Sequence, residues 1–187
     1  MALIKNGEVA LDEWVRIADG ETLPPGRPAI VSLTRWLDEK TALRGHNAPL
    51  GLHLTAADDP GTIADDVPRF GLIAIDFPAF TDGRGYSTAR LLRERLGFSG
   101  ELRAVGNVLR DQASLMARCG FDAFELGAQV SIDGWLTALS EISVCYQPAA
   151  EPPLNCVIHR YRPSARSFAI ASLSWLMRRV SPWALSG

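Results

Sequence analysis

The sequence predicts an α/β fold, with a five-stranded, mainly parallel sheet between flanking helices and a small β-hairpin at the N-terminus. From residue 29 onward, short apolar runs alternate with helical stretches, which is the pattern of repeated βα units. The run at residues 72–75 is apolar without interruption, as expected for a strand that is covered on both faces. Two architectures stay open, an open doubly wound sheet and an incomplete βα-barrel. We favour the open sheet, because a closed barrel normally uses about eight βα units.

The N-terminal hairpin is predicted from the pair Asn6-Gly7, which suits a two-residue type I′ turn between the short runs 2–5 and 8–10. Residues 14–17 alternate in polarity and predict a third short strand. The proline-rich stretch 24–28 is typical of a stiff connector. We therefore divide the chain into a hairpin and connector (1–28), an α/β domain (29–147) and a basic C-terminal tail (148–187).

The five strands of the sheet are expected at residues 29–33, 50–54, 72–76, 101–106 and 121–126. His53 lies inside the second of these, and we interpret it as a core or sheet-face histidine rather than a catalyst. Residues with the usual preferences for helix ends mark the helices between and after the strands. They are Thr34, Asp59 before Pro60 and Ser131 as N-caps, and Gly97 and Gly120 as C-terminal glycines.

A glycine-rich turn follows the strand that ends at Asp76 and opens a helix. Glycines let the backbone approach a ligand, and the start of a helix favours an anion. The predicted anion-binding residues of this turn are Thr81, Gly83, Arg84, Gly85, Tyr86 and Ser87. The alternative is a loop in which Asp82 or Ser87 only caps the helix and Arg84 is solvated.

Further polar residues follow the other predicted strands, and the carboxyl ends of parallel strands are where ligands bind in such sheets. Asp76 and Glu125 are candidate catalytic bases, Arg110 joins Arg84 as an anion clamp, and Asn107 is a candidate orienting donor. The alternative is that Arg110 lies in an exposed first turn of a helix. Cys119 precedes a helix-ending glycine and is expected to be buried and unreactive.

Composition limits the possible functions. The hydrophobic content of 47% in 187 residues excludes general disorder. The net charge of −2 divides into +4 for residues 151–187 and −6 for residues 1–150, and such an acidic body argues against nucleic-acid binding. No basic and apolar leader opens the chain and no apolar run reaches the ~20 residues of a membrane span, so we expect a cytoplasmic protein. The three cysteines and three histidines show no metal-ligand spacing.

Several segments resemble a bacterial family of unknown function whose members are described as oxidoreductases involved in sulfite reduction. The resemblance lies in residues 3–7, 14–16, 77–87, 100–106, 108–112 and 118–126, and it extends to about residue 147. It implies a role in assimilatory sulfite reduction, with the siroheme-containing sulfite reductase as the partner. A small oxyanion such as sulfite is a ligand that the glycine-rich turn and Arg84 suit.

The expected function is therefore an accessory or oxidoreductase-linked component of sulfite reduction that holds a small oxyanion. No flavin, nicotinamide, iron–sulfur or siroheme fingerprint is evident in the sequence, so catalysis stays open. Two alternatives remain: a non-catalytic module that binds and supports the reductase, and an unrelated enzyme that acts on a small anionic metabolite. A homo-oligomer also stays open.

The tail at 148–187 departs from the resemblance and reverses the sign of the charge. Three interpretations remain: a frame-shifted end, a helix that docks on the domain, or a basic amphipathic segment for a membrane or partner. We assign it no function.

Overall fold

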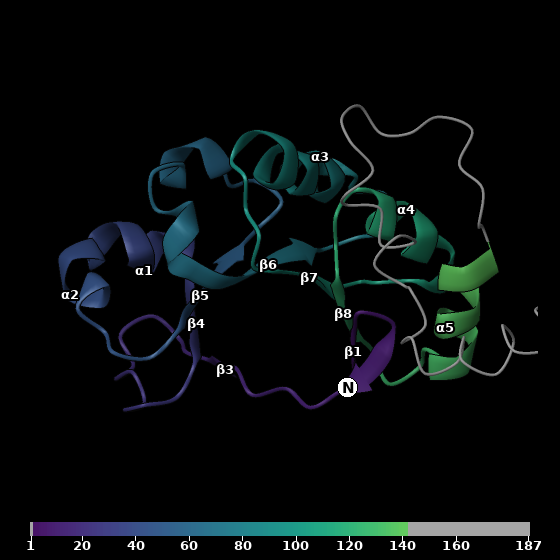
Figure 1. Cartoon of the computed structure of the whole chain (residues 1–187), viewed down its shortest axis with the longest axis horizontal. Coiled ribbons are helices and arrows are strands. Elements are labelled where there is room, and N and C mark those ends of the chain that lie inside the picture. The colour runs from purple at the N-terminus through teal and green to yellow at the C-terminus, as the bar shows by residue number, and fades with distance from the viewer. Residues whose placement is uncertain (1, 142–187) are drawn as a thin grey trace, which may run out of the picture.

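Eight strands form one curled sheet in the order β2-β1-β8-β7-β6-β5-β4-β3. The structure is a computed structural model that describes residues 2–141 (Figure 1), so the predictions for the tail at 148–187 lie outside the described residues. The strands are β1 (Ala2–Lys5), β2 (Glu8–Ala10), β3 (Val15–Arg16), β4 (Ala29–Ser32), β5 (Leu50–Leu54), β6 (Phe70–Phe77), β7 (Glu101–Gly106) and β8 (Ala123–Leu126).

The strands from β3 to β8 are parallel, and each lies beside the one before it in the chain. A doubly wound sheet reverses its strand order at a switch point. Here the order from β3 to β8 does not reverse, so the open doubly wound arrangement is wrong and the incomplete βα-barrel is right. The α/β class is confirmed, but the sheet has eight strands because β1 and β2 extend it beyond β8 and β3 extends it beyond β4.

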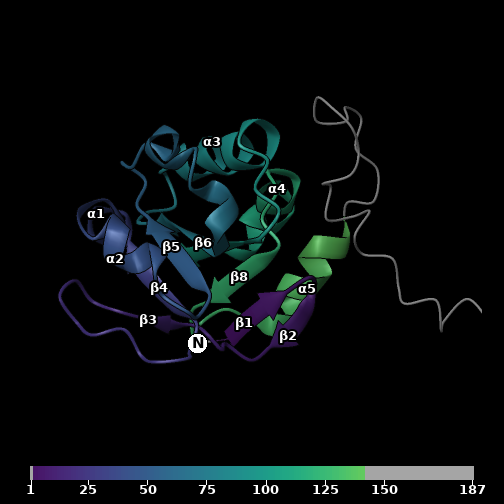
Figure 2. The same ribbon diagram turned by 60° about the vertical axis from the view of Figure 1, so that its left-hand side comes forward.

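The helices lie on the outer face of the curl (Figure 2). They are α1 (Leu33–Asp38), α2 (Lys40–Arg44), α3 (Arg84–Arg90) with a π-turn at Leu91–Arg95, α4 (Ala113–Arg118) and α5 (Ile132–Glu141). Short 3₁₀ turns occupy Pro60–Ile63, Val67–Arg69 and Arg110–Gln112. Within the described residues, no helix is long and apolar enough to cross a membrane.

Local sequence signals account for most element boundaries. Asn6 and Gly7 have φ angles of 53° and 81°, which confirms the type I′ turn, and β1 also pairs antiparallel with β8. Ser131 caps α5 as predicted, because its Oγ accepts a hydrogen bond from Gly134 N at 3.3 Å. Thr34 was the wrong cap for α1: Ser32 Oγ accepts from Arg35 N at 3.0 Å, so the helix begins earlier.

Asp59 is a cap as predicted, but the turn that it opens at Pro60 is a 3₁₀ helix. Gly97 and Gly120 end their helices with positive φ angles. The strand predicted at 121–126 begins at Ala123, and the strand predicted at 72–76 is longer at both ends.

Alternate residues of each strand face the helices and form the main core. Ile73 and Ile75 of β6 are fully buried on this side, where they belong to the same cluster as Trp36 of α1 and Trp135 of α5. Each fully buried aliphatic side chain contributes ~1.5–3 kcal/mol of transfer free energy. Leu72 and Ala74 are also fully buried but belong to a second cluster with Trp14, so β6 is covered on both faces as predicted.

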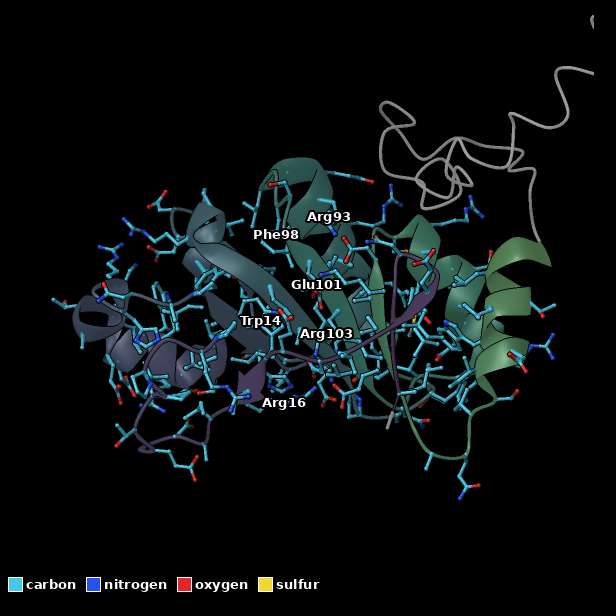
Figure 3. The ribbon with its side chains drawn as sticks, turned by 60° about the horizontal axis from the view of Figure 1, so that its bottom comes forward. Trp14, Arg16, Arg93, Phe98, Glu101 and Arg103 are labelled. Carbon is cyan, nitrogen blue, oxygen red and sulfur yellow. The ribbon has the colours of Figure 1, made fainter. Side chains whose placement is uncertain are left out.

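The concave face is crossed by the segment that leads from β2 into β3. Trp14 lies over two strand glycines, because a Cβ on Gly51 or Gly71 would come within about 3.1–3.2 Å of its ring. Arg103 of β7 is 1% exposed and pairs with Asp12 of this segment and with Glu101, each at 2.8 Å. Figure 3 shows Trp14 and Arg103 on this face, next to the crossing segment. The inside of the curl is thus filled, in the amino-terminal halves of the strands, by an aromatic ring and a buried ion cluster.

Arg93, labelled in Figure 3, binds the residues that precede β7 and β8. Its guanidinium donates to the carbonyl oxygens of Phe98, Gly100 and Gly120 at 2.7–2.9 Å and pairs with Asp122 at 2.8 Å. These hydrogen bonds satisfy a buried charge and fix the loops that enter both strands.

Candidate functional site

The carboxyl ends of the parallel strands carry a group of polar side chains on the concave face. Strand alternation puts His53 of β5 and Asp76 of β6 on the face opposite the helix-facing Leu52, Leu54 and Ile75. Arg16, Asp76, Asp58 and Glu125 lie close enough to His53 for their charges to influence its pKa. Asp76 and Glu125 were predicted as candidate bases at this end of the sheet.

Arg16 reaches across the curl to Glu125. Its Nη2 lies 2.6 Å from Glu125 Oε2, although β3 and β8 have four strands between them in the sheet. The curl of the half-barrel therefore brings the first and last parallel strands together over the concave face. Glu125 is 16% exposed and Arg16 is half-exposed, so the pair lies at the mouth of the site.

The surroundings of His53 favour its neutral form over its charged form. Burial lowers its pKa below the usual value of 6.5, and the positive charge of Arg16 lowers it further. The carboxylates of Asp76, Asp58 and Glu125 act in the opposite direction but do not reverse the shift. A neutral imidazole has one nitrogen that donates a hydrogen bond and one that accepts, so His53 can pass a proton to or from a ligand.

Asp76 is the last residue of β6 whose side chain faces the concave side of the sheet. Among residues 2–141 its carboxylate has no hydrogen bond or ion pair, and it is half-buried. Gly106, at the end of β7, leaves the space for this carboxylate, because a Cβ there would lie 2.5 Å from Asp76 Oδ1. Gly106 also has a φ of +86°, which glycine adopts without strain. A half-buried carboxylate without a protein partner is suited to accept a hydrogen bond from a ligand.

One rim of the site is a fixed loop at residues 18–21. Arg35 donates to the carbonyl oxygens of Ala18 at 2.9 Å and Glu21 at 2.6 Å. Ser32, the register neighbour of His53, donates through its Oγ to Asp19 at 2.6 Å. The loop is thereby held beside the carboxyl end of β4.

The predicted anion residues of the glycine-rich turn follow β6 and lie around the start of α3. Arg84 is 62% exposed and pairs with Asp82 at 2.7 Å, and this pairing lowers the pKa of the Asp82 carboxyl to about 2. Gly85 makes room for Phe77, because a Cβ there would lie 2.7 Å from the Phe77 ring. Tyr86 packs edge-on against the same ring. The remaining members of the predicted set are exposed: Thr81, Gly83 and Ser87.

Asn107 and Arg110 follow β7. The Asn107 backbone N–H donates to Phe77 O at 2.7 Å, which ties the two strand ends together. Arg110 is exposed, and its Cδ would lie 3.7 Å from a Cβ on Gly134, so it borders the first turn of α5. Anion binding by these residues and by the glycine-rich turn stays a prediction. Cys119 is buried as predicted, and burial raises the pKa of its thiol.

Sequence reasoning missed Arg16 and His53 as site residues. The signal for His53 was present in β5, where it is the polar residue between Leu52 and Leu54 near the carboxyl end of the strand. Arg16 carried no such signal, because its contact with Glu125 joins residues 109 positions apart.

Comparison with models of known protein families gives a match. The model of a family described as bacterial proteins of unknown function (DUF934) matches residues 51–156, which include His53, Asp76 and Glu125. No curated protein matches the chain. Among the described residues, no group of histidines, cysteines and carboxylates is arranged to hold a metal ion.

Proposed function

The chain belongs to the DUF934 family of bacterial proteins of unknown function, and we propose that its concave-face site holds a small oxyanion as an accessory component of assimilatory sulfite reduction. In this proposal Arg16 binds the charged oxygen atoms of the anion. Asp76 accepts a hydrogen bond from the protonated oxygen of the anion, and His53 lies beside it. The reducing electrons come from the partner reductase and not from this chain.

The observation that carries the proposal is the meeting of a guanidinium, a neutral imidazole and an unpaired carboxylate at the carboxyl ends of the strands. A guanidinium has five N–H donors, and the hydrogen bond from Arg16 to Glu125 uses one of them. The others can bind an oxyanion. Because Glu125 holds Arg16 at this place, its role here is positioning.

The carboxylate of Asp76 supports a preference for an anion that still carries a proton. A protonated oxyanion can donate a hydrogen bond to Asp76 while Arg16 binds its charged oxygen atoms. Fully ionised sulfate has no proton to donate, and it would meet Asp76 as a like charge. Hydrogensulfite and hydrogenphosphate fit this pattern, and sulfate does not.

The link to sulfite reduction rests on the family resemblance described above. The conversion of sulfite to sulfide turns its oxygen atoms into water and consumes protons. A site that binds the oxyanion beside a neutral histidine suits the delivery of a protonated substrate to a reductase.

Calorimetric titration of the full-length chain with sulfite, phosphate and sulfate tests the site. We expect sulfite and phosphate to bind, sulfate to bind at least tenfold more weakly, and Arg16→Gln to weaken sulfite binding at least tenfold. Arg84→Gln is the matched control and should leave binding unchanged. Equal binding by the Arg16→Gln variant would contradict the proposal. Loss of binding in Arg84→Gln alone would move the site to the glycine-rich turn.

Growth of a deletion strain on sulfate, sulfite or sulfide as the only sulfur source tests the pathway. We expect growth on sulfide alone, with rescue by the wild-type chain and not by Arg16→Gln. Equal growth on all three sources would separate the site from sulfite reduction.

A second candidate function is a non-catalytic module that binds the reductase. The observation that favours it is the outer strand β2, which leaves one edge of the sheet unpaired among the described residues. Val9 is 60% exposed on it, and Leu11, just beyond, is 92% exposed. Such an edge can pair with a strand of a partner. Co-purification with the reductase that Val9→Lys abolishes and Arg16→Gln leaves intact would favour this function.

A further inference from the structure

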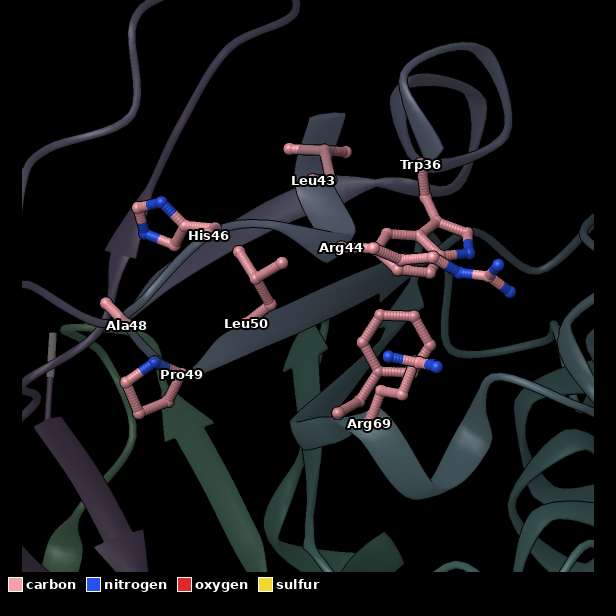
Figure 4. Close-up of a pocket in the computed structure, with 9 residues that line it drawn as sticks. Trp36, Leu43, Arg44, His46, Ala48, Pro49, Leu50 and Arg69 are labelled. Carbon is pink, nitrogen blue, oxygen red and sulfur yellow. The ribbon is translucent and has the colours of Figure 1, made fainter. Parts of the chain in front are cut away.

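A cavity lies at the opposite end of the sheet from the concave-face site. It has a volume of about 260 Å³ and opens beside Leu50 and Phe70, the first residues of β5 and β6 (Figure 4). Ligand pockets of small molecules commonly have volumes of ~300–1,000 Å³. The size of this cavity therefore suits a small metabolite.

Polar and apolar side chains share the lining of the cavity, and its apolar part is firmly packed. Trp36 of α1 and Phe70 pack edge to face with ring centroids 4.8 Å apart, and both are buried. Leu43 of α2 and Leu50 belong to the same apolar lining, together with Ala48 and Pro49. The two rings and two aliphatic side chains are suited to the flat or aliphatic body of an organic ligand.

Positive charge is in excess at one side of the cavity. Asp66 is 1% exposed and is the common partner of Lys40, Arg44 and Arg69. Three cations on one carboxylate leave two positive charges that Asp66 does not balance. Arg44 and Arg69 both line the cavity, and Arg69 is the weakest partner of Asp66, at 3.8 Å. Each of the two guanidinium groups has N–H donors beyond those that face Asp66, and these donors can bind an anion.

His46 supplies a polar group to the same cavity. Its Nε2 is buried and has no hydrogen-bond partner among the described residues. Figure 4 shows His46 beside Ala48 and Pro49, separated in this view from Arg44 and Arg69 by the apolar lining. Buried polar atoms in folded proteins normally have a partner, and a ligand can supply the missing one.

We propose that this cavity binds a small aromatic carboxylate whose ring carries a hydroxyl group. The carboxylate pairs with Arg44 and Arg69, the ring packs against Phe70 and Leu50, and the hydroxyl bonds to His46 Nε2. Trp36 closes the inner wall. The site uses the amino ends of β5 and β6, so it is separate from the oxyanion site and does not depend on it.

Calorimetric titration of the full-length chain with 4-hydroxybenzoate tests the proposal. Benzoate lacks the hydroxyl, and 4-hydroxybenzyl alcohol lacks the charge. We expect 4-hydroxybenzoate to bind, benzoate to bind at least threefold more weakly, and the neutral alcohol to bind at least tenfold more weakly. Absence of binding by 4-hydroxybenzoate at millimolar concentration would overturn the proposal.

Variants assign the binding to the cavity. Arg69→Gln should weaken the binding of 4-hydroxybenzoate at least tenfold. Arg95→Gln removes a charge from an exposed position of the π-turn and should leave this binding unchanged. Ala48→Leu keeps every charge and fills the cavity, so it should also weaken binding. Equal binding in Arg69→Gln and Arg95→Gln would overturn the proposal, as would normal binding in Ala48→Leu. Sulfite binding should not change in any of these variants, which separates this test from that of the oxyanion site.

Discussion

Replacement of Arg103 by methionine should destabilise the fold and weaken the candidate site together. Arg103 is 1% exposed and forms ion pairs with Glu101 and Asp12, each at 2.8 Å. Removal of one partner from a buried ion pair typically costs ~3–5 kcal/mol, because the other charge stays buried. Glu101 is almost fully buried but keeps Lys5 at 2.7 Å, and Asp12 is 39% exposed and can be hydrated. We therefore expect a loss near the lower end, about 3 kcal/mol.

The effect on the site follows from the chain path. The pair between Arg103 and Asp12 anchors the segment that leads into β3, and Arg16 is the last residue of that strand. When the anchor is lost, Arg16 is held less firmly over the concave face. We expect the Arg103→Met variant to bind sulfite at least threefold more weakly under conditions in which it is still folded.

Urea unfolding of the full-length chain, monitored by tryptophan fluorescence, measures the loss of unfolding free energy in Arg103→Met. Arg95→Met is the matched control, and its exposed side chain should give a change within about 0.5 kcal/mol. A double-mutant cycle with Asp12→Ala isolates the pairwise interaction. A loss below about 1 kcal/mol in Arg103→Met would refute the reasoning, because it would mean that the buried cluster does not hold the segment.

Three further predictions concern single groups. Gly106→Ala should lower the free energy of unfolding by ~2–3 kcal/mol, because the residue has a φ of +86° and the new Cβ would lie 2.5 Å from Asp76 Oδ1. Gly127→Ala is the control, because a Cβ at Gly127 would have nothing within 4 Å. NMR titration should give His53 a pKa below 6.5, and this pKa should rise in Arg16→Gln. Because the folded chain disfavours the charged imidazole, the contribution of His53 to stability is complete above pH 6.5 and is lost as the pH falls below that value. Cys119 should react with a thiol reagent only slowly in the folded chain and at the normal rate in urea, because burial raises its pKa; fast reaction without urea would contradict this.

Most of the local structure could be predicted from short-range signals. The strands at 50–54 and 101–106 have the predicted bounds, because apolar residues mark both and Gly100 and Gly106 mark the ends of the second. The type I′ turn and the Ser131 cap were also correct, since each depends on one or two residues and their own backbone. Thr34 failed as a cap because Ser32, two residues earlier, is equally suited to the role and lies where β4 ends.

The candidate site could be predicted only in part. Asp76 and Glu125 could be placed at the carboxyl ends of strands, since each follows an apolar run of the sheet. The role of Arg84 as an anion clamp stays a prediction, and the structure adds a local partner in Asp82, two residues away. A pattern of residue types does not say which charges pair with each other, because pairing depends on side-chain geometry.

The sequence by itself determined the alternation of strands and helices, the caps and turns, and the set of polar residues at strand ends, because these depend on neighbours within a few positions. Only the tertiary structure decided that the sheet keeps its chain order and curls, so that Arg16 meets Glu125 beside His53. It also decided that the N-terminal hairpin pairs with β8. The physical reason is that strand order, curl and long-range ion pairs follow from the packing of both sheet faces at once, and no local stretch of sequence specifies that packing.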